Sequence, residues 1–236
     1  MTQDAIDRSW NYGDAGDRWQ VAFGDVWSCG PHILACGDLA EGDANVLVDG
    51  FGKPDFAYVD PPWNKGNARA FRTKAHASTP EIETGPVDFK GFLDALVDAL
   101  SRVKFDCFVE MGHAQLPLLK DRIEQAGGDV GIVWDTVYYR RHPSHLVHCW
   151  WNSATFMPVV DFTGMDDEKT PFAALNSVAK HGKTVFDPCI GRGLTAMAAE
   201  SLDLRVIGLE LNPRRLAVAI DRLATLGHQP ERMGKL

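Results

Sequence analysis

A block near the carboxyl end constrains the fold of this chain most strongly. Residues 184–186 form a short apolar run, residues 187–193 form a turn with two glycines, and residues 194–201 follow with helical spacing. A second apolar run at 205–209 and a second helical pattern at 213–226 complete the block. This succession predicts a βαβ unit with parallel strands and a trailing helix.

The rest of the sheet has to come from earlier in the chain, because the residues after Glu210 suffice for one helix only. Apolar runs bounded by turn residues predict three further buried strands, at residues 32–36, 55–59 and 105–109. Apolar residues at helical spacing predict three helices, at residues 88–101, 114–126 and 171–179.

Aromatic and β-branched residues are dense at 130–139 and 150–162, which predicts an antiparallel hairpin at one edge of the sheet. The alternation of strands and helices predicts an α/β fold, a Rossmann-like doubly wound sheet that is mostly parallel. The sequence shows no internal repeat and no linker rich in Pro, Gly or Ser. We therefore expect a single domain over residues 1–236, with a polar, loosely ordered lead-in at 1–20.

Composition excludes several classes of protein. Hydrophobic residues make up 45% and charged residues 24% of the chain, as in ordinary globular proteins. No apolar stretch is long enough to span a membrane, and the start lacks a secretion signal. The five cysteines are widely spaced without a CxxC pair, which predicts a reducing cytoplasm and no zinc site. The net charge of −8 restricts nucleic-acid contacts to local basic segments.

The glycine-containing turn predicts a ligand. Gly191 and Gly193 lie between a strand and a helix, where the backbone can approach a ligand and helix N–H groups can hold an anion. Glu210 ends the next strand and could accept both hydroxyls of a ribose, so the pair predicts a nucleoside-containing cofactor. Because Gly191-x-Gly193-x-x-Ala196 also matches the dinucleotide fingerprint, an NAD-dependent oxidoreductase is an alternative, as is a tight turn without a ligand.

A second motif, Asp60-Pro61-Pro62-Trp63, follows the predicted strand at 55–59. Two consecutive prolines stiffen the turn and fix the Asp60 carboxylate relative to the Pro61 carbonyl, so two acceptors converge on one amino group. Trp63 offers a flat face for a heteroaromatic ring, such as a base withdrawn from a duplex. A rigid turn with a core tryptophan is the structural alternative.

These motifs resemble the amino-group DNA methyltransferases that use S-adenosyl-L-methionine, whose signature is (Asp/Asn/Ser)-Pro-Pro-(Tyr/Phe/Trp). Residues 185–196 and 207–213 resemble the family's cofactor turn and acidic ribose strand. The catalytic tetrapeptide precedes the cofactor turn, so the order resembles the circularly permuted beta class of methyltransferases. The resemblance extends over residues 31–72 and 168–224.

The resemblance implies that Asp60, Pro61, Pro62 and Trp63 are catalytic, with Asp60 and the Pro61 carbonyl accepting hydrogen bonds from the attacking amino group. It implies cofactor contacts from nine residues: Asp38, Lys169, Asp187, Cys189, Gly191, Gly193, Thr195, Glu210 and Asn212. Cys189, Ile190 and Arg192 depart from the family, which commonly has Phe and Ser in this turn.

Basic residues form two clusters that we predict to bind the DNA backbone, although solvated loops are the alternative. The first lies in a predicted substrate loop at 64–87 and comprises Lys65, Arg69, Arg72 and Lys74. The second lies at 128–165, a possible target-recognition region, and comprises Arg140 and Arg141 with His142, His145 and His148. A metal bound by these histidines is disfavoured, because Pro143 opposes a regular helix there.

The sequence thus predicts a DNA methyltransferase specific for adenine N6, of the kind found in restriction–modification systems. Methylation of cytosine N4 is the nearest alternative. A catalytically silent cofactor-binding subunit is an alternative from a different class, although the intact Asp60-Pro61-Pro62-Trp63 motif argues against it. RNA is an alternative substrate, and a homodimer is the default oligomeric expectation.

Overall fold

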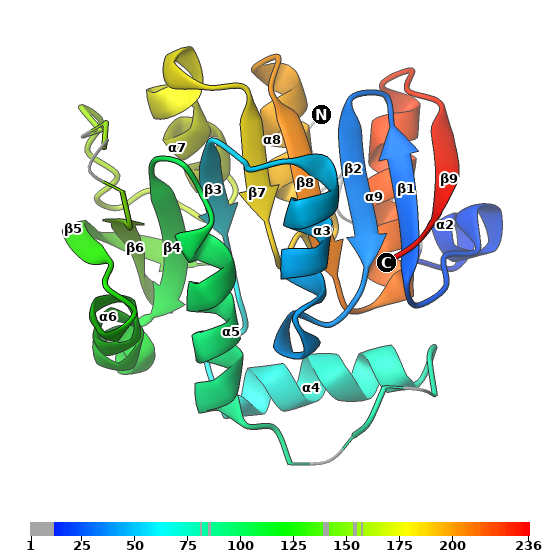
Figure 1. Ribbon diagram of the computed structural model, residues 1–236, viewed down its shortest axis with the longest axis horizontal. Helices are drawn as coiled ribbons and strands as arrows, with labels where there is room; N and C mark the ends of the chain where they lie inside the picture. Colours follow the sequence, from blue (N-terminus) through cyan, green and yellow to red (C-terminus); the bar gives the residue numbers. More distant parts are fainter. Residues whose placement is uncertain (1–11, 81, 85, 139–141, 153–154, 157) are drawn as a thin grey trace.

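The computed structural model describes residues 12–236 apart from 81, 85, 139–141, 153, 154 and 157. Within these residues, nine strands form one sheet in the order β5-β6-β4-β3-β7-β8-β2-β1-β9 (Figure 1). The strands are β1 (Asp25–Cys29), β2 (His32–Cys36), β3 (Phe56–Val59), β4 (Cys107–Gly112), β5 (Asp129–Tyr138), β6 (His142–Trp150), β7 (Thr184–Asp187), β8 (Arg205–Glu210) and β9 (Pro230–Lys235).

The centre of the sheet is parallel, and both edges are antiparallel. Strands β4, β3, β7, β8 and β2 pair in parallel. The hairpin of β5 and β6 forms one edge, while β1 and β9 form the other. The predicted mostly parallel sheet with an antiparallel edge hairpin is therefore confirmed. The second antiparallel edge, made by β1 and β9, has no counterpart in the sequence predictions.

Helices cover both faces of the sheet (Figure 1). One face packs on α3, α5 and α6, and the other packs on α7, α8 and α9. The helices are α2 (Tyr12–Trp19), α3 (Asp43–Phe51), α4 (Lys65–His76), α5 (Phe89–Ser101), α6 (Leu116–Gln125), α7 (Thr170–Val178), α8 (Leu194–Ser201) and α9 (Pro213–Thr225), with short 3-10 turns at Leu39–Glu41, His113–Gln115 and Ala179–His181. No helix in the described part of the chain is both long and apolar enough to cross a membrane.

Strands β3 and β7 are neighbours from which the chain departs in opposite directions. After β3 the chain crosses through α5 to β4, and after β7 it crosses through α8 to β8. Asp55 fixes this junction, because its carboxylate accepts the backbone N–H groups of Lys183 and Thr184 at 2.8 and 3.0 Å. Lys104, just before β4, donates to the same carboxylate at 2.8 Å. Ligands of doubly wound sheets bind at the carboxyl ends of strands at such a junction.

The position predicted for the second strand of the hairpin, residues 150–162, is wrong. The strand lies at His142–Trp150, and the described residues between 151 and 162 are not in a strand. The side chain of Thr155 and the backbone N–H of Phe156 instead donate to the buried carboxylate of Asp106, so this segment is held by a side chain and not by a neighbouring strand. The density of β-branched residues gave no sign that the Asp106 side chain would bind this segment in place of a neighbouring strand.

The substrate loop predicted at 64–87 contains a helix, α4, over Lys65–His76. Asn64 caps it by accepting the N–H of Asn67 at 2.9 Å, and Ala68 and Ala75 form its buried side. The predicted lead-in is also partly helical: Trp19 in α2 donates its indole N–H to Asp221 of α9 at 2.9 Å. Residues 1–11 lie outside the described part of the chain.

Gly193 provides a test of how the turn before α8 is built. Its φ of +84° is left-handed, and a Cβ there would lie 2.8 Å from the Cβ of Ala219 in α9. We expect Gly193→Ala to lower the free energy of unfolding by about 1–3 kcal/mol, through backbone strain and overpacking. Gly50→Ala is the control, because no atom lies within 4 Å of its added Cβ; in helix α3 it should stabilise by about 0.5–1 kcal/mol. Urea unfolding of both variants measures this, and equal effects would contradict the packing argument.

Candidate active site

Four acidic side chains converge at the carboxyl edge of the parallel strands. Asp60 follows β3, Asp187 ends β7, Glu210 ends β8, and Asp38 follows β2. Beside them lies a cavity of about 510 Å³. The strand ends supply part of its wall, and α4, α5 and the segment between them supply the opposite wall. The parallel pairing of β3, β7, β8 and β2 is what gathers residues so distant in sequence.

The Asp60-Pro61-Pro62-Trp63 motif lines this cavity. The Trp63 indole N–H donates to Asp60 Oδ1 at 3.0 Å, so the aromatic ring and the carboxylate hold each other in place. Asp60 Oδ2 and the Pro61 carbonyl are the further acceptors of the motif. The motif therefore presents hydrogen-bond acceptors and an aromatic ring at one wall of the cavity.

Trp63 is held from behind as well. A Cβ on Gly112, at the end of β4, would lie 2.8 Å from Trp63 Cε3, so the ring packs directly on the glycine backbone. The Tyr138 ring also packs on Trp63, with centroids 4.5 Å apart and planes at 57°. Tyr138 lines the cavity too, so β5 contributes to the aromatic part of the site.

The electrostatic environment of Asp60 is unusual for a carboxylate. Burial raises the pKa of Asp60 to about 7; the Trp63 hydrogen bond opposes this rise, and the nearby Asp167 adds to it. Asp167 reaches the site because its backbone N–H donates to the Val137 carbonyl at 3.2 Å, which holds residues 165–167 beside β5. Asp60 therefore changes its charge near neutral pH.

The turn after β7 is built around Asp187. Its carboxylate accepts the backbone N–H of Cys189 at 3.0 Å and a hydrogen bond from the Thr195 side chain. Burial raises the pKa of Asp187 to about 7 despite these two bonds. Gly191 and Gly193 have φ values of +57° and +84°, the left-handed conformation that favours glycine.

Glu210 is nearly buried, with 8% of its surface exposed, and it lines the cavity. One oxygen accepts the backbone N–H of Asn212 at 2.8 Å, and the other lies 3.7 Å from Arg215 Nε. Asn212 in turn caps α9 by accepting the N–H of Arg214 at 2.9 Å. Asn212 thus positions Glu210 and α9 together.

Asp38 is the fourth carboxylate, and it is 5% exposed. Its Oδ1 accepts the backbone N–H of Ala40 at 3.0 Å, and its Oδ2 lies 2.6 Å from the guanidinium of Arg72 on α4. Arg72 is one of the residues predicted to bind DNA, and in the structure it lines the cavity.

The predicted catalytic and cofactor residues, together with Arg72, fall into three groups. Those that line the cavity are Asp38, Asp60, Pro61, Pro62, Trp63, Arg72, Cys189 and Glu210. Those that support its wall without lining it are Asp187, Gly191, Gly193, Thr195 and Asn212. Lys169 is apart from both groups: its side chain is 76% exposed, and its ammonium lies 3.9 Å from Asp166.

Lys65, Arg69 and Lys74 are exposed on α4, away from the cavity lining. Arg140 and Arg141 lie outside the described residues. The histidines of β6 diverge: His145 lies 3.0 Å from Asp135, and the His148 ring is hydrogen-bonded to the buried Asp106 at 2.7 Å. Residues an odd number apart in a strand face opposite sides of the sheet, so His145 and His148 have separate partners.

Sequence reasoning missed the charged residues that act on Asp60 and Glu210, namely Glu110, Asp167 and Arg215. Glu110, 2% exposed, accepts a hydrogen bond from the Tyr58 hydroxyl at 2.7 Å, and burial raises its pKa well above the ordinary value, with the Asp60 charge acting in the same direction. Glu110 follows Val109, the register partner of Val59, so it stands beside Asp60. Because the predicted strand ended at residue 109, the sequence prediction did not place Glu110 next to Asp60. Asp167 and Arg215 reach the site only through tertiary contacts, and no local signal marks them.

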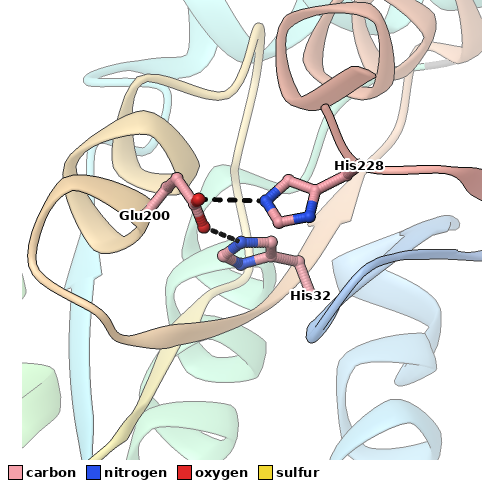
Figure 2. A group of neighbouring side chains, drawn as sticks. All are labelled: His32, Glu200 and His228. Carbon is pink, nitrogen blue, oxygen red and sulfur yellow. Dashed lines mark hydrogen bonds and ion pairs between the residues drawn. The ribbon is translucent and has the colours of Figure 1, made fainter. Parts of the chain in front are cut away.

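One group of side chains outside this cavity has metal-ligand composition (Figure 2). Glu200 of α8 lies between two histidines: its oxygens are 2.8 Å from His32 Nε2 and 3.1 Å from His228 Nε2. His32 begins β2, and His228 lies in the turn between α9 and β9. The group therefore joins three elements of the fold.

The protonation of His32 argues against a metal in this group. The backbone N–H of Val206 donates to His32 Nδ1 at 3.2 Å, so Nδ1 carries a lone pair and the neutral ring carries its proton on Nε2. That N–H donates to Glu200, and a metal at Nε2 would require the ring to lose this proton too. We interpret the group as a hydrogen-bonded clamp.

Comparisons with known proteins find solved structures with a similar fold. No protein-family model and no curated protein matches the sequence. The structure is similar to the M1.HpyAVI–SAM complex, with a TM-score of 0.57, 15% identity, and coverage of 80% of this chain and 98% of that one. It is also similar to TTHA0409 from Thermus thermophilus, described as a putative DNA modification methylase, in complex with S-adenosyl-L-methionine (TM-score 0.55, 19% identity, 82% and 93% coverage).

A third similar structure is the PvuII DNA methyltransferase, described as cytosine-N4-specific, with a TM-score of 0.55, 11% identity, and coverage of 82% of this chain and 90% of that one. At these identities the similarity shows a shared fold. The chain has the α/β architecture of these three structures.

The hydrogen-bonded group of His32, Glu200 and His228 predicts a pH-dependent contribution to stability. Burial opposes ionisation of Glu200, but hydrogen bonds from His32 and His228 outweigh it and hold the pKa of Glu200 below its ordinary value. Glu200→Gln offers one oxygen to two histidines, so we expect a loss of about 1 kcal/mol at pH 7. Because the folded-state pKa is lowered, this contribution is complete above the ordinary carboxyl pKa, so the loss should shrink as the pH falls below about 4.3 and through the lower pKa of the folded state.

Denaturant unfolding of the wild type and Glu200→Gln between pH 7 and about pH 3 measures this effect. Glu231→Gln, on the exposed strand β9, is the matched control and should change stability by less than about 0.5 kcal/mol. A Zn²⁺-dependent rise in melting temperature that the wild type shows and Glu200→Gln lacks would contradict the clamp and favour a metal site.

Proposed function

We propose that this protein is an S-adenosyl-L-methionine-dependent DNA methyltransferase that methylates the exocyclic N6 of adenine. The carrying observation is that one cavity joins the Asp60-Pro61-Pro62-Trp63 motif to the carboxylates of Asp38 and Glu210. The shared fold with the two structures that contain S-adenosyl-L-methionine supports the proposal.

The hydrogen-bond acceptors around the cavity fit the proposed cofactor. Glu210 has the position at the end of β8 from which a carboxylate can accept ribose hydroxyls, and Asp38 follows the neighbouring strand β2. S-adenosyl-L-methionine supplies an activated methyl group on a positively charged sulfonium. The acidic residues near the cavity outnumber Arg72 and Arg215, which favours a cationic ligand over a neutral one. Lys169, Asp187, Cys189, Gly191, Gly193, Thr195 and Asn212 complete the proposed cofactor region.

In the proposed mechanism, Asp60 and the Pro61 carbonyl accept hydrogen bonds from the target amino group. These bonds direct the nitrogen lone pair toward the methyl carbon as the nitrogen becomes tetrahedral. The N–C bond forms as the S–C bond breaks, the electron pair stays on sulfur, and the amine loses one proton. Asp60, with its pKa near 7, is suited to accept that proton. Trp63 supplies the face on which the base stacks.

The proposed DNA partner meets the site from the side of α4. Lys65, Arg69 and Lys74 are exposed on this helix, directly after the catalytic motif. Phosphate contacts of this type position a duplex without reading its sequence. Arg140 and Arg141 follow Tyr138, which lines the cavity, and we propose the same role for them.

Cytosine N4 is the second candidate target. Its exocyclic amine requires the same acceptors, and the PvuII enzyme described as cytosine-N4-specific shares the fold. An aspartate at the first position of the motif favours adenine, following the family resemblance.

The proposal predicts that Asp60→Ala severely slows methyl transfer while cofactor binding survives, because Asp60 acts on the amino group and not on the cofactor. Loss of such a preorganised acceptor lowers the rate by about 10²–10³-fold. Tritiated methyl transfer from S-adenosyl-L-methionine to unmethylated genomic DNA, followed by digestion to nucleosides and mass analysis, measures rate and product together.

Label in methyladenosine that disappears in Asp60→Ala is the expected result. Label in methylcytidine would keep the mechanism and change the base. Substantial activity in Asp60→Ala would contradict the catalytic assignment, and a wild type that binds cofactor without labelling DNA would favour an RNA substrate or a silent subunit.

The raised pKa of Asp60 predicts a pH profile. Asp60 can accept both the amino hydrogen bond and the released proton only when it is ionised, so the single-turnover rate at saturating cofactor should rise through about pH 7 and fall on acidification. Asp60→Asn keeps a carbonyl acceptor for Trp63 and should be slower without this rise. Asp187→Asn removes the other carboxyl group with a pKa of about 7. In this variant the rate should still rise through about pH 7. A rise that persists in Asp60→Asn and vanishes in Asp187→Asn would contradict the assignment of this titration to Asp60.

A further inference from the structure

Helix α4 lies across the carboxyl edge of the sheet (Figure 1). Its residues Asn67, Ala68, Phe71 and Arg72 line the cavity. A ligand that fills the cavity therefore contacts this helix as well as the strand ends.

The first tie between α4 and the sheet edge is the pair of Arg72 and Asp38. The guanidinium lies 2.6 Å from Asp38 Oδ2, and the two side chains are 22% and 7% exposed. Arg72 Nε also donates to the Glu83 carbonyl at 3.0 Å, which ties the segment after α4 to the same arginine. Partly buried, charge-assisted bonds of this length are among the stronger polar contacts in proteins.

The second tie runs through Arg215 at the start of α9. Its guanidinium carbon lies 4.8 Å from the centre of the Phe71 ring on α4, within range of a cation–π contact. Its Nε lies 3.7 Å from Glu210. Both ties therefore end on a carboxylate that the proposed function assigns to the cofactor, Asp38 in one case and Glu210 in the other.

A ligand donor and Arg72 would compete for the carboxylate of Asp38. Its Oδ1 accepts the Ala40 N–H, and its Oδ2 contacts Arg72, so each oxygen keeps one further acceptor site. A ligand donor that bonds to Asp38 shares the same negative charge with Arg72 and therefore weakens the Arg72 contact. The displaced guanidinium would then join Lys65, Arg69 and Lys74, which are already exposed on the same helix.

We propose that Arg72 clamps α4 over the cofactor pocket through Asp38, and that cofactor binding releases it to contact a DNA phosphate. This inference rests on the proposed function and adds a positive coupling between the cofactor site and the DNA surface. Because coupling between two binding sites is reciprocal, DNA should also tighten cofactor binding by the same factor.

The experiment measures both affinities in one set of proteins. S-adenosylhomocysteine, which lacks the transferable methyl group, is titrated by calorimetry, and a fluorescent DNA duplex is titrated by anisotropy with and without it. For the wild type we expect S-adenosylhomocysteine to tighten DNA binding by about tenfold. For Arg72→Ala we expect tighter S-adenosylhomocysteine binding, because no ion pair has to break, and coupling reduced to less than about twofold.

Arg69→Ala is the matched control. It removes the same charge from the same helix, but Arg69 is exposed and does not line the cavity. It should weaken DNA binding to a similar extent with and without S-adenosylhomocysteine, so that coupling persists. Arg72→Lys keeps a charge opposite Asp38 and should retain part of the coupling.

The outcomes separate the two proposals. Wild-type coupling that is unchanged in Arg72→Ala, or absent from the wild type despite binding of both ligands, would overturn the clamp and leave the proposed function intact. A wild type that binds no S-adenosylhomocysteine would overturn both. Equal loss of coupling in Arg69→Ala would show a general charge effect and would also overturn the clamp.

Discussion

Parallel pairing of β3 with β7 brings together segments from distant parts of the chain, and the site depends on it. Phe56 and Ala57 pair with Val185 and Phe186, and this register sets Asp60 beside the Asp187 turn. The Asp55 carboxylate fixes the register at the opposite end by accepting two backbone N–H groups at the start of β7. Those bonds, with the Lys104 ammonium, outweigh burial and hold the pKa of Asp55 below its ordinary value.

Charge is the second constraint on the site. Carboxylates gather at the strand ends because turns after parallel strands share one edge, and burial makes their ionisation costly. Asp60 and Asp187 both have a pKa raised to about 7, while Arg72 and Arg215 supply the nearby positive charge. A cationic ligand would relieve this imbalance, which connects the electrostatics of the fold to the proposed chemistry and to the release proposed for Arg72.

The sequence predictions succeeded where a signal is local. The βαβ block, the Asp60-Pro61-Pro62-Trp63 turn and most buried strands follow from apolar runs, prolines and glycines within a few residues of one another. They failed where a distant partner decides the conformation. The polar segment after Trp63 forms a helix whose alanine face is buried by the rest of the fold, although its Asn64 cap is a local signal that the loop prediction overlooked. The strand expected after Trp150 is replaced by bonds to the distant Asp106.

By itself, the sequence determined the motif residues and the order of most strands and helices, because hydrophobic periodicity and turn chemistry act over short distances. The tertiary structure alone decided which side chains share the cavity. Glu110 stands beside Asp60 through strand register, Asp167 reaches the site along β5, and Arg72 meets Asp38 across the pocket. Such contacts join residues far apart in the chain, so only the packing of the complete sheet and its helices specifies them.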